Sequence, residues 1–362
     1  MRSPTQIVAL DVEPLDIPLH VPFGISGGSQ AMANNVLVTV ELADGTRGYG
    51  EAAPLPPYNG ETQVMALAAL NTTQDWLPGR DAADWRALAV EFFGKGGAGC
   101  GSAQCALEMA LLDAVTRRRG EPMWKFFGGV STTLETDMTV TTGTEAEAAE
   151  AARAIRARGI RMIKVKVGGA AGPAGDLARV AAIHAAAPDA PLILDGNARL
   201  SRAAASELVS GLKSAGIKPA LLEQWLAKDD LAGAAALIVE SGWKTAADET
   251  ACTAADARKI AAAKAAHFVN IKLMKSGIIA ALDLATAARA AGLGLMIGGN
   301  VESILAMSVS ASFAAGIGGF GFADLDTPLF MASNPFDGGF TLEGGMISVA
   351  HIAAGHGVTP RM

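Results

Sequence analysis

Short apolar segments recur along residues 134–325, and alanine-rich stretches separate them. Such alternation predicts repeated βα units around a parallel sheet. The eight expected strands are 136–141, 162–167, 191–195, 220–224, 244–248, 267–272, 293–298 and 319–324. Eight strands of this kind fit an α/β fold of the (β/α)8 TIM-barrel type, which typically needs about 250 residues. This segment is shorter, so its helices must be compact or one of them incomplete.

The N-terminal part of the sequence has a different pattern of predicted strands and helices. Residues 36–42 and 48–51 read as two strands, and the Asp44-Gly45 pair between them is a strong hairpin signal. Residues 61–120 read as helices, with Ser102 as the expected cap of a helix that reaches Arg119. The sequence therefore predicts an N-terminal α+β domain at residues 1–130 and a barrel domain at 131–328. The tail, residues 329–362, is expected to pack back on the N-terminal domain.

Charge and composition exclude several classes of protein. The chain has 362 residues and a net charge of −7, which argues against a nucleic-acid-binding surface. No apolar run approaches the length of a membrane span, and the N-terminus lacks the apolar core of a secretion signal. The three cysteines, Cys100, Cys105 and Cys252, have no zinc-like spacing. We therefore expect a cytoplasmic protein that acts on a small molecule, away from membranes.

Three consecutive expected strands each end in an acidic residue: Asp195, Glu223 and Asp248. The active site of such a barrel lies at the C-terminal ends of its strands, so these side chains should meet there. A single acid at a strand end more often caps the following helix. Three buried carboxylates together repel each other and call for a cation, and an all-oxygen set suits Mg²⁺, for which Mn²⁺ can substitute. We therefore predict a metal site.

Two lysines, Lys164 and Lys166, point to one face of the expected strand 162–167. Alone, they would most simply be a solvated strand face. Lys272, however, ends the expected sixth strand, which lies opposite the second in an eight-stranded ring. Two lysines facing each other beside a metal suit removal of a proton from one face of a carbon and its return on the other. Racemisation or epimerisation α to a carboxylate is the natural use, because the metal can stabilise the enediolate.

The expected last strand leads into Asp324-Leu325-Asp326. Two acids at the rim of a pocket would attract an ammonium group of a substrate. Asp326-Thr327-Pro328 is also an acceptable turn, so a purely structural role is the alternative. Likewise Lys164, one pleat below Lys166, either contacts the substrate carboxylate or fills the barrel interior against an acid. The neighbouring cations are expected to lower the pKa of the catalytic lysines.

Together these motifs resemble the muconate-lactonizing subgroup of the enolase superfamily, and within it the dipeptide epimerases of the L-Ala-D/L-Glu type. The resemblance extends from Pro22-Phe23 and Gly48-Tyr49-Gly50-Glu51 through Lys164-Val165-Lys166 to Asp324-Leu325-Asp326. It implies a modified (β/α)7β barrel under an N-terminal capping domain, which also accounts for the short barrel segment. Enolase-superfamily sites use a lysine or histidine base with Mg²⁺.

The resemblance also implies residue roles. Lys166 and Lys272 are the expected acid/base catalysts, Lys164 assists at the carboxylate, and Asp324 with Asp326 holds the free amino group of the dipeptide. The implied Mg²⁺ ligands are Asp195, Glu223 and Asp248. The family often forms homo-oligomers, so one is expected here by analogy.

The loop after Pro22-Phe23 departs from the family pattern. An arginine that can meet a substrate glutamate is replaced there by a stretch without basic residues, 24–28. The expected substrates are therefore L-Ala-X dipeptides whose C-terminal residue X is small or hydrophobic, with Phe23, Ile25 and Tyr58 as pocket walls. The alternatives are an N-acylamino-acid racemase, an o-succinylbenzoate synthase, a muconate cycloisomerase or a barrel without enzymatic activity.

Overall fold

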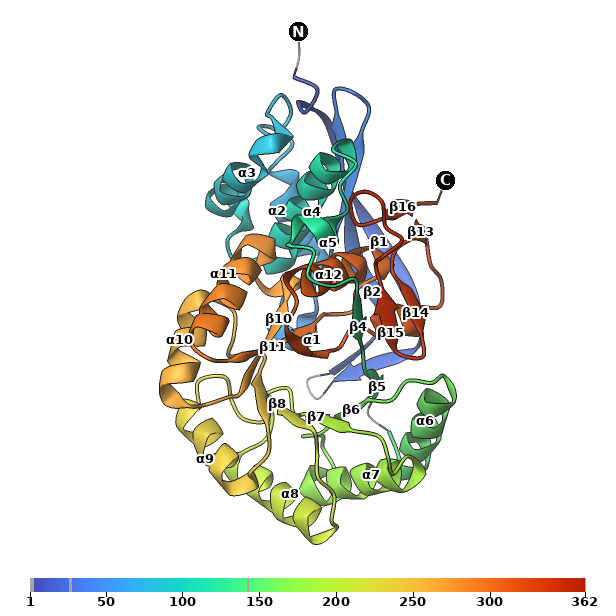
Figure 1. Ribbon diagram of the computed structural model, residues 1–362, viewed down its shortest axis with the longest axis vertical. Coiled ribbons are helices and arrows are strands. Elements are labelled where there is room, and N and C mark those ends of the chain that lie inside the picture. The colour runs from blue at the N-terminus through green and yellow to red at the C-terminus, as the bar shows by residue number, and fades with distance from the viewer. Residues whose placement is uncertain (1–2, 26–27, 142, 362) are drawn as a thin grey trace.

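The computed structural model describes residues 3–25, 28–141 and 143–361. An N-terminal cap lies at one end of the molecule and a barrel at the other (Figure 1). Among the residues described, no helix is both long and apolar enough to cross a membrane.

The cap is built on an antiparallel sheet of three strands, β1 (Ile7–Ile25), β2 (Gly28–Leu42) and β3 (Arg47–Ala52). The hairpin predicted around Asp44-Gly45 is confirmed, because Val40 of β2 pairs with Gly48 of β3. In the described part of the cap, the helices and short helical turns are α1 (Pro56–Asn59), α2 (Gln63–Asn71), η1 (Ala82–Asp84), α3 (Trp85–Phe92), η2 (Phe93–Gly97) and α4 (Gly101–Arg118).

Helix α4 packs so closely on β3 that two glycines of the strand are required. A Cβ atom at Gly48 would lie 2.2 Å from the carbonyl oxygen of Ala110, and one at Gly50 would lie 2.0 Å from that of Ala106. Both distances are far below van der Waals contact. The Gly-Tyr-Gly sequence therefore serves helix packing.

The prediction that Ser102 caps α4 is wrong. The helix begins one residue earlier, at Gly101, and its N-cap, Cys100, makes no capping hydrogen bond. Instead the carboxylate of Glu61, from the loop before α2, accepts hydrogen bonds from the backbone N–H groups of Gly101 (2.8 Å) and Ser102 (3.1 Å). A carboxylate distant in sequence thus satisfies the helix terminus, which local sequence cannot reveal.

Within the described residues, the barrel contains eight parallel strands that alternate with seven α-helices, the (β/α)7β order implied by the family resemblance. The elements are β5 (Met138–Val140), α6 (Glu145–Ala157), β6 (Ile163–Lys166), α7 (Gly172–Ala186), β7 (Leu192–Asp195), α8 (Arg202–Ser214), β8 (Leu221–Glu223), α9 (Leu231–Ser241), β9 (Thr245–Ala247), α10 (Ala254–Ala263), β10 (Phe268–Lys272), α11 (Gly277–Ala290), β11 (Gly294–Gly298), α12 (Ile304–Ile317) and β12 (Phe320–Ala323). Each strand lies within its predicted segment. Figure 1 shows α6 to α11 along the outside of the strands.

The first and last strands meet at a seam. Strands β5 and β12 are the two ends of the sheet order. Asp137 N–H donates to the carbonyl of Ala323 (3.0 Å), and Leu325 N–H donates to the hydroxyl of Thr136 (2.9 Å). A third bond runs from Thr139 N–H to a carboxylate oxygen of Asp326 (2.6 Å). The residues after β12 are thus attached to β5, which brings the Asp324-Leu325-Asp326 segment to the barrel mouth.

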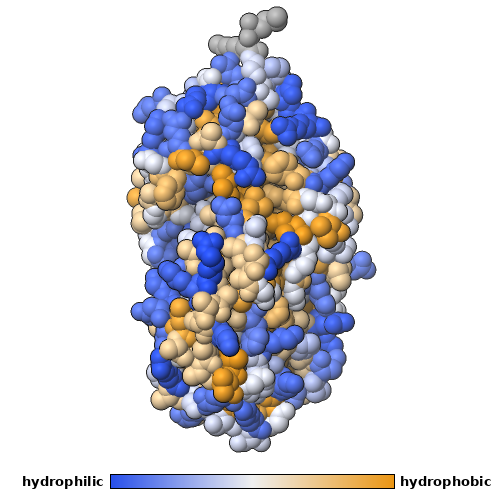
Figure 2. All heavy atoms as spheres, turned by 60° about the vertical axis from the view of Figure 1, so that its left-hand side comes forward, coloured by the Kyte–Doolittle hydropathy of each residue, from blue (hydrophilic) through white to orange (hydrophobic). Residues whose placement is uncertain are grey.

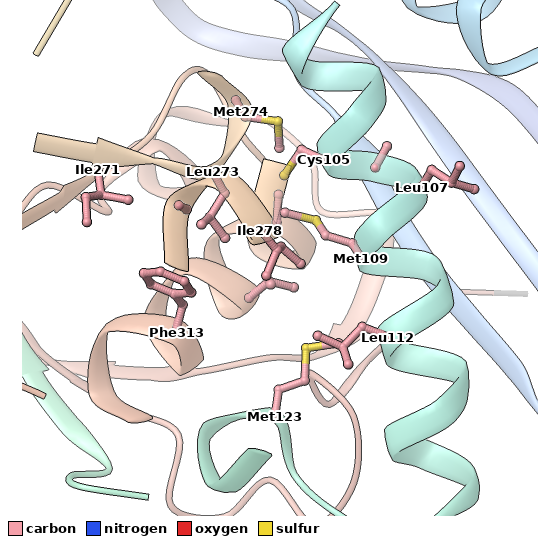
Figure 3. Packing of buried hydrophobic residues seen from close by; sticks show 14 of the residues in the cluster. Cys105, Leu107, Met109, Leu112, Met123, Ile271, Leu273, Met274, Ile278 and Phe313 are labelled. Carbon is pink, nitrogen blue, oxygen red and sulfur yellow. The ribbon is translucent and has the colours of Figure 1, made fainter. Parts of the chain in front are cut away.

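The cap and the barrel share one continuous apolar core. Figure 3 shows Cys105 and Met109 of α4 directed toward Leu273 and Ile278, in η3 (Leu273–Lys275) and α11 of the barrel, and Leu112 of α4 beside Met123. All six side chains are fully buried. Burial of this kind stabilises each part against the other by roughly 25 cal/mol per Å² of apolar surface. The cap is therefore held firmly over the barrel mouth.

The remaining elements connect the C-terminal tail to both parts. They are α5 (Met123–Phe126), β4 (Thr133–Glu135), η4 (Thr327–Phe330), β13 (Phe336–Gly338), β14 (Thr341–Glu343), β15 (Met346–Ser348) and β16 (Val358–Pro360). Strand β15 pairs with β4, and buried His356 contacts Asp113 of α4 at 3.1 Å. The tail thus contacts α4 of the cap. The domain division, with residues 329–362 assigned to the cap, remains a prediction.

Candidate active site

The predicted metal ligands lie side by side at the barrel mouth. In the parallel ladder, Lys166 of β6 pairs with Asp195 of β7, which pairs with Glu223 of β8. Asp248 follows β9 directly, and its side chain, like those of Asp195 and Glu223, is fully buried. The strands form because their apolar residues are buried, and each places an acid where the apolar run ends.

Lys164 lies at the centre of this acidic group. Its Nζ atom is 3.0 Å from Asp195 Oδ2, 2.8 Å from Glu223 Oε2 and 2.7 Å from Asp324 Oδ2. The side chain is fully buried. Burial opposes the charged ammonium group, but Asp195, Asp324 and Glu223 outweigh it and raise the pKa of Lys164 well above its ordinary value. The lysine is therefore a fixed positive charge.

The two predicted acid/base lysines each pair with a different predicted metal ligand. Lys166 Nζ lies 2.6 Å from Asp195 Oδ2, and Lys272 Nζ lies 2.8 Å from Asp248 Oδ2. The two lysines come from β6 and β10, with three strands between them in the sheet. They therefore approach the barrel mouth from different walls, as two bases acting on opposite faces of one carbon require.

As predicted, the neighbouring cation Lys164 lowers the pKa of Lys272, but the net pKa in this arrangement is set by another group. Burial does lower the pKa of Lys272, but the charge of Asp248 outweighs burial and raises it above the ordinary value. Asp248, which was predicted to bind a metal, is here the ion-pair partner of Lys272. A lysine in this state is protonated and can act as an acid, and it becomes a base only when Asp248 is engaged elsewhere.

The predicted ligands have opposite protonation tendencies. Burial raises the pKa of Asp248, but Lys272 and Lys275 outweigh it and lower the pKa to about 2. Burial, and then the charge of Asp195, raises the pKa of Glu223 to about 7. Asn270 donates a hydrogen bond to Glu223 Oε1 (2.7 Å) and so orients that carboxylate. Three buried carboxylates of this kind form an all-oxygen donor set that suits a hard divalent cation.

The carboxylate oxygens of Asp195, Glu223 and Asp248 do not converge on one point. In the described part of the chain, the acidic group whose ligand atoms all lie within 4.8 Å of one another is a different one, formed by Asp137, Asp324 and Asp326. Lysine ammonium groups lie between the predicted ligands. The chemistry of the predicted donor set fits Mg²⁺, and its role as the metal site remains a prediction.

The sequence did not reveal Asp137. Its carboxyl group is fully buried, and among the described residues neither of its oxygens has a hydrogen-bond partner. Asp137 lies just before β5, two residues from Thr139, so both side chains lie on the same side of the chain. Because the first and last strands of a barrel are neighbours, an acid at this position could have been paired with Asp324 in advance.

Two of the predicted pocket walls reach the site from the cap. Phe23 and Tyr58 line a small cavity together with Lys166, Lys272 and Asp324. Phe23 packs edge-on against Phe330, with 5.4 Å between the ring centres. The third predicted wall, Ile25, ends β1, but its side chain lies outside the described residues.

Tyr58 joins the cap to the predicted catalytic groups. Its hydroxyl donates to Asp248 Oδ1 (3.2 Å), and the Nζ atom of Lys272 lies 4.6 Å from the centre of its ring. Lys275 also contacts Asp248 Oδ1, at 3.0 Å. Tyr58 thus covers the Lys272–Asp248 pair, and its ring can stabilise the ammonium group through a cation–π contact.

A groove of about 590 Å³ runs between cap and barrel beside this cavity. Tyr58, Glu249 and Lys275 line its inner part, and Val90 and Phe93 of the cap line its exposed part. Burial, and then the charge of Asp248, raises the pKa of Glu249 to about 8. On the face shown in Figure 2, apolar areas are interrupted by polar ones, so the two kinds of residue share this surface.

Two family models match the chain. Residues 7–128 match the mandelate racemase / muconate lactonizing enzyme N-terminal domain, and residues 146–362 match the enolase C-terminal domain-like family. Together these ranges cover most of the chain.

Curated relatives and solved structures agree with these matches. The chain is 52% identical to an aromatic dipeptide epimerase of Herpetosiphon aurantiacus, over 98% of this chain and 99% of that protein. A mandelate racemase/muconate lactonizing enzyme from Roseiflexus sp. is similar in structure, with a TM-score of 0.94, 53% identity and full coverage of both chains. The dipeptide epimerase of Enterococcus faecalis, solved with Mg and L-Leu-L-Tyr, has a TM-score of 0.92 at 27% identity and covers 98% of this chain and 99% of its own.

Proposed function

The chain belongs to the mandelate racemase / muconate lactonizing enzyme family of the enolase superfamily, and from that premise we propose that it is a Mg²⁺-dependent dipeptide epimerase. Its curated relatives are named as epimerases, so it is an isomerase. The proposed reaction inverts the α-carbon of the C-terminal residue of an L-Ala-X dipeptide. One observation carries the proposal: Lys166, Lys272, Asp324 and Asp326 line the same small cavity under Phe23 and Tyr58.

In the proposed mechanism, Lys166 and Lys272 flank the α-carbon. One lysine removes the α-proton and the other returns a proton to the opposite face, so a single turnover changes the configuration. Each lysine must first leave its carboxylate, Asp195 or Asp248, since a paired ammonium group cannot accept a proton. Bound Mg²⁺, held by Asp195, Glu223 and Asp248, would supply positive charge next to the substrate carboxylate and stabilise the enediolate.

Lys164 has a separate part in this mechanism. Its ammonium group is held between the metal-type carboxylates and Asp324, so it lies between the place of the substrate carboxylate and the place of the amino terminus. Its raised pKa keeps it charged. We infer that Lys164 keeps the acidic groups of the two subsites apart and assists in binding the carboxylate.

The main alternative is another reaction of the same family, such as N-acylamino-acid racemisation, o-succinylbenzoate synthesis or muconate cycloisomerisation. Those substrates carry no free ammonium group, whereas Asp324 and Asp326 offer two buried carboxyl groups to one. The relatives named as dipeptide epimerases also favour the first reaction. Loss of dipeptide binding in Asp326→Asn, with metal content retained, would support the dipeptide reaction.

Hydrophobic C-terminal residues are the proposed preference. The described cavity walls from the cap are the apolar side chain of Leu55 and the aromatic rings of Phe23 and Tyr58. The segment 22–28 contains no basic residue that could meet a glutamate side chain. The relatives named as aromatic and hydrophobic dipeptide epimerases agree with this reading. We therefore expect L-Ala-L-Phe and L-Ala-L-Leu to react with a higher kcat/KM than L-Ala-L-Glu.

Deuterium exchange tests the reaction and the preference together. The Mg²⁺-loaded enzyme is incubated in D₂O with a panel of L-Ala-L-X dipeptides, and the products are analysed by mass spectrometry and by NMR. We expect one deuterium at the C-terminal α-carbon together with formation of the L-Ala-D-X epimer. No exchange across the whole panel, with metal bound and the protein folded, would contradict the proposal.

A further inference from the structure

Asp137 is a buried acidic residue to which the proposed mechanism assigns no role. It is fully buried, yet its two carboxyl oxygens have no hydrogen-bond donor among the described residues. One oxygen of Asp326, Oδ1, is in the same condition. A buried polar atom without a partner is costly, so a proton or a cation is needed at this place.

The surroundings of Asp137 are mostly negative. Ligand oxygens of Asp137, Asp324 and Asp326 lie within 4.8 Å of one another. The titratable groups that face Asp137 are these two acids, from the segment after β12, and Lys164 of β6. Lys164 is also paired with Asp195 and Glu223, so it cannot neutralise three further carboxylates. The charges of Lys166 and Lys272 also reach Asp324, but these two lysines are paired with Asp195 and Asp248. In the free protein the cluster must therefore hold at least one proton.

The geometry identifies Asp137 as the carrier of that proton. Asp324 already has Lys164 as a partner at 2.7 Å, and Asp326 accepts the Thr139 N–H at 2.6 Å, so both have a donor for one oxygen. Asp137 has none. Burial, and then the charges of Asp324 and Asp326, also raises the pKa of Asp137 well above its ordinary value.

We propose that Asp137 is a proton-linked member of the amine subsite: it is a neutral acid in the free enzyme and releases its proton to solvent when a dipeptide ammonium group enters the cluster. The O–H bond of the carboxyl group breaks, the proton goes to the buffer, and the new carboxylate faces the new cation. This inference rests on the proposed function, since it takes the dipeptide amine as the ligand. Asp137 acts as a positioning and charge-setting residue, with Asp324 and Asp326 nearer to the substrate.

Calorimetry can count the proton. The Mg²⁺-saturated enzyme is titrated at pH 7.0 with the dipeptide of L-alanine and α-methylphenylalanine, which has no α-proton to lose. The titration is repeated in buffers of different ionisation enthalpy, and the slope of observed heat against that enthalpy gives the protons released. We expect the wild type to release close to one proton more than Asp137→Asn, and the variant to bind about tenfold more weakly.

Two controls separate this effect from others. Glu108→Gln removes another buried acid whose pKa burial raises, on α4 and outside the cluster, and should release as many protons as the wild type. The N-acetylated ligand has no ammonium group, and no release should accompany its binding. Proton uptake by the amine of the ligand is common to wild type and variants, so it cancels in the difference.

Several outcomes would overturn the inference. Equal proton release by the wild type and Asp137→Asn would do so. If the Asn variant fails to fold, equal release with the free and the N-acetylated ligand in the wild type decides against it. A second Mg²⁺ equivalent, bound without dipeptide by the wild type and lost in the variant, would instead assign the cluster to a metal. Absence of both dipeptide binding and deuterium exchange would contradict the proposed function, whereas binding with an unchanged proton count contradicts only this inference.

Discussion

At the scale of single residues, the site consists of positive charges placed between negative ones. Lys164, Lys166 and Lys272 each contact a carboxylate of the predicted metal set, at 2.6 to 3.0 Å. Such pairs hold the lysines in place, and the carboxylate charges raise the pKa of Lys164 and of Lys272 above its ordinary value. Engagement of the carboxylates by a divalent cation would free the lysines for proton transfer, so metal binding and base strength are linked.

Replacement of either proposed catalytic lysine should separate exchange from epimerisation. In Lys166→Ala and Lys272→Ala we expect epimerisation to fall by roughly 10²–10⁴-fold, because each removes one general acid/base group. Each variant should still exchange the α-proton of one epimer, and the two should differ in which epimer that is. NMR in D₂O with L-Ala-L-Phe and L-Ala-D-Phe measures this.

Lys259→Ala is the matched control, because Lys259 is an exposed lysine of α10 and should leave both rates unchanged. If both catalytic-lysine variants exchange both epimers at the wild-type rate, the two-base assignment is wrong.

At the scale of elements, close packing of α4 on β3 sets a strict size limit. In Gly50→Ala the new Cβ would lie 2.0 Å from the carbonyl of Ala106, so the helix or the strand must move. Overpacking of this kind typically costs about 1–3 kcal/mol. We expect a lower free energy of unfolding in urea, while Gly94→Ala, whose Cβ has no neighbour within 4 Å, should be tolerated.

Helix α4 is also joined to the C-terminal tail by a buried acid. Asp113 accepts from Arg117 Nε (2.6 Å) and from the backbone N–H of His356 (3.0 Å), and it contacts the His356 ring. Burial raises the pKa of Asp113, but His356 and Arg117 outweigh it and lower the pKa. Removal of one partner of such a buried network costs about 3 kcal/mol.

The pH dependence follows from that lowered pKa. A depressed carboxyl pKa stabilises the fold fully above the unfolded value of about 3.9, and the contribution disappears as pH falls through the folded pKa. Asp113→Asn should therefore be less stable than the wild type at pH 7, and the difference should narrow below about pH 4. Urea unfolding at several pH values measures it. Asp337→Asn, at an exposed ion pair, should change little, and an equal loss there would contradict the role of Asp113.

The sequence predicted the elements better than it predicted the contacts between them. Each barrel strand lies inside its expected segment, because apolar runs of strand length bounded by polar residues leave little choice. The group that accepts hydrogen bonds from the N-terminus of helix α4 was predicted wrongly, because Glu61 lies forty residues away in the sequence. The pairing of Lys272 with Asp248 and the cluster around Asp137 depend on how the ring closes, which no local pattern encodes.

At the scale of the whole molecule, the site is assembled only when cap and barrel are together. Tyr58 of the cap contacts Asp248 of the barrel, and Glu51 of β3 accepts hydrogen bonds from Ser303 N–H (2.9 Å) and Ala306 N–H (3.2 Å) at the start of α12. Two apolar clusters, of which the second includes Ile17 and Phe23 of the cap, also join the two parts. Cap and barrel should therefore unfold as one unit.

Ligands that bind at this junction should raise the unfolding temperature. With Mg²⁺ and a dipeptide each at 100 times its dissociation constant, mass action stabilises the folded state by about 2.7 kcal/mol per ligand. Differential scanning calorimetry should then show one transition that shifts upward with ligand. Two separate transitions, only one of which shifts, would show that the two parts unfold independently.

At the seam between the first and last strands, closure of the barrel and the proposed selectivity for the substrate depend on the same residue, Asp326. The carboxylate of Asp326, proposed to recognise the substrate amine, also receives the Thr139 N–H that helps to close the ring. A homologue that replaces this acid in order to accept another substrate also loses the hydrogen bond from Thr139 N–H that helps to close its barrel. Divergence toward substrates without an amine should therefore require a second, compensating change in the first strand.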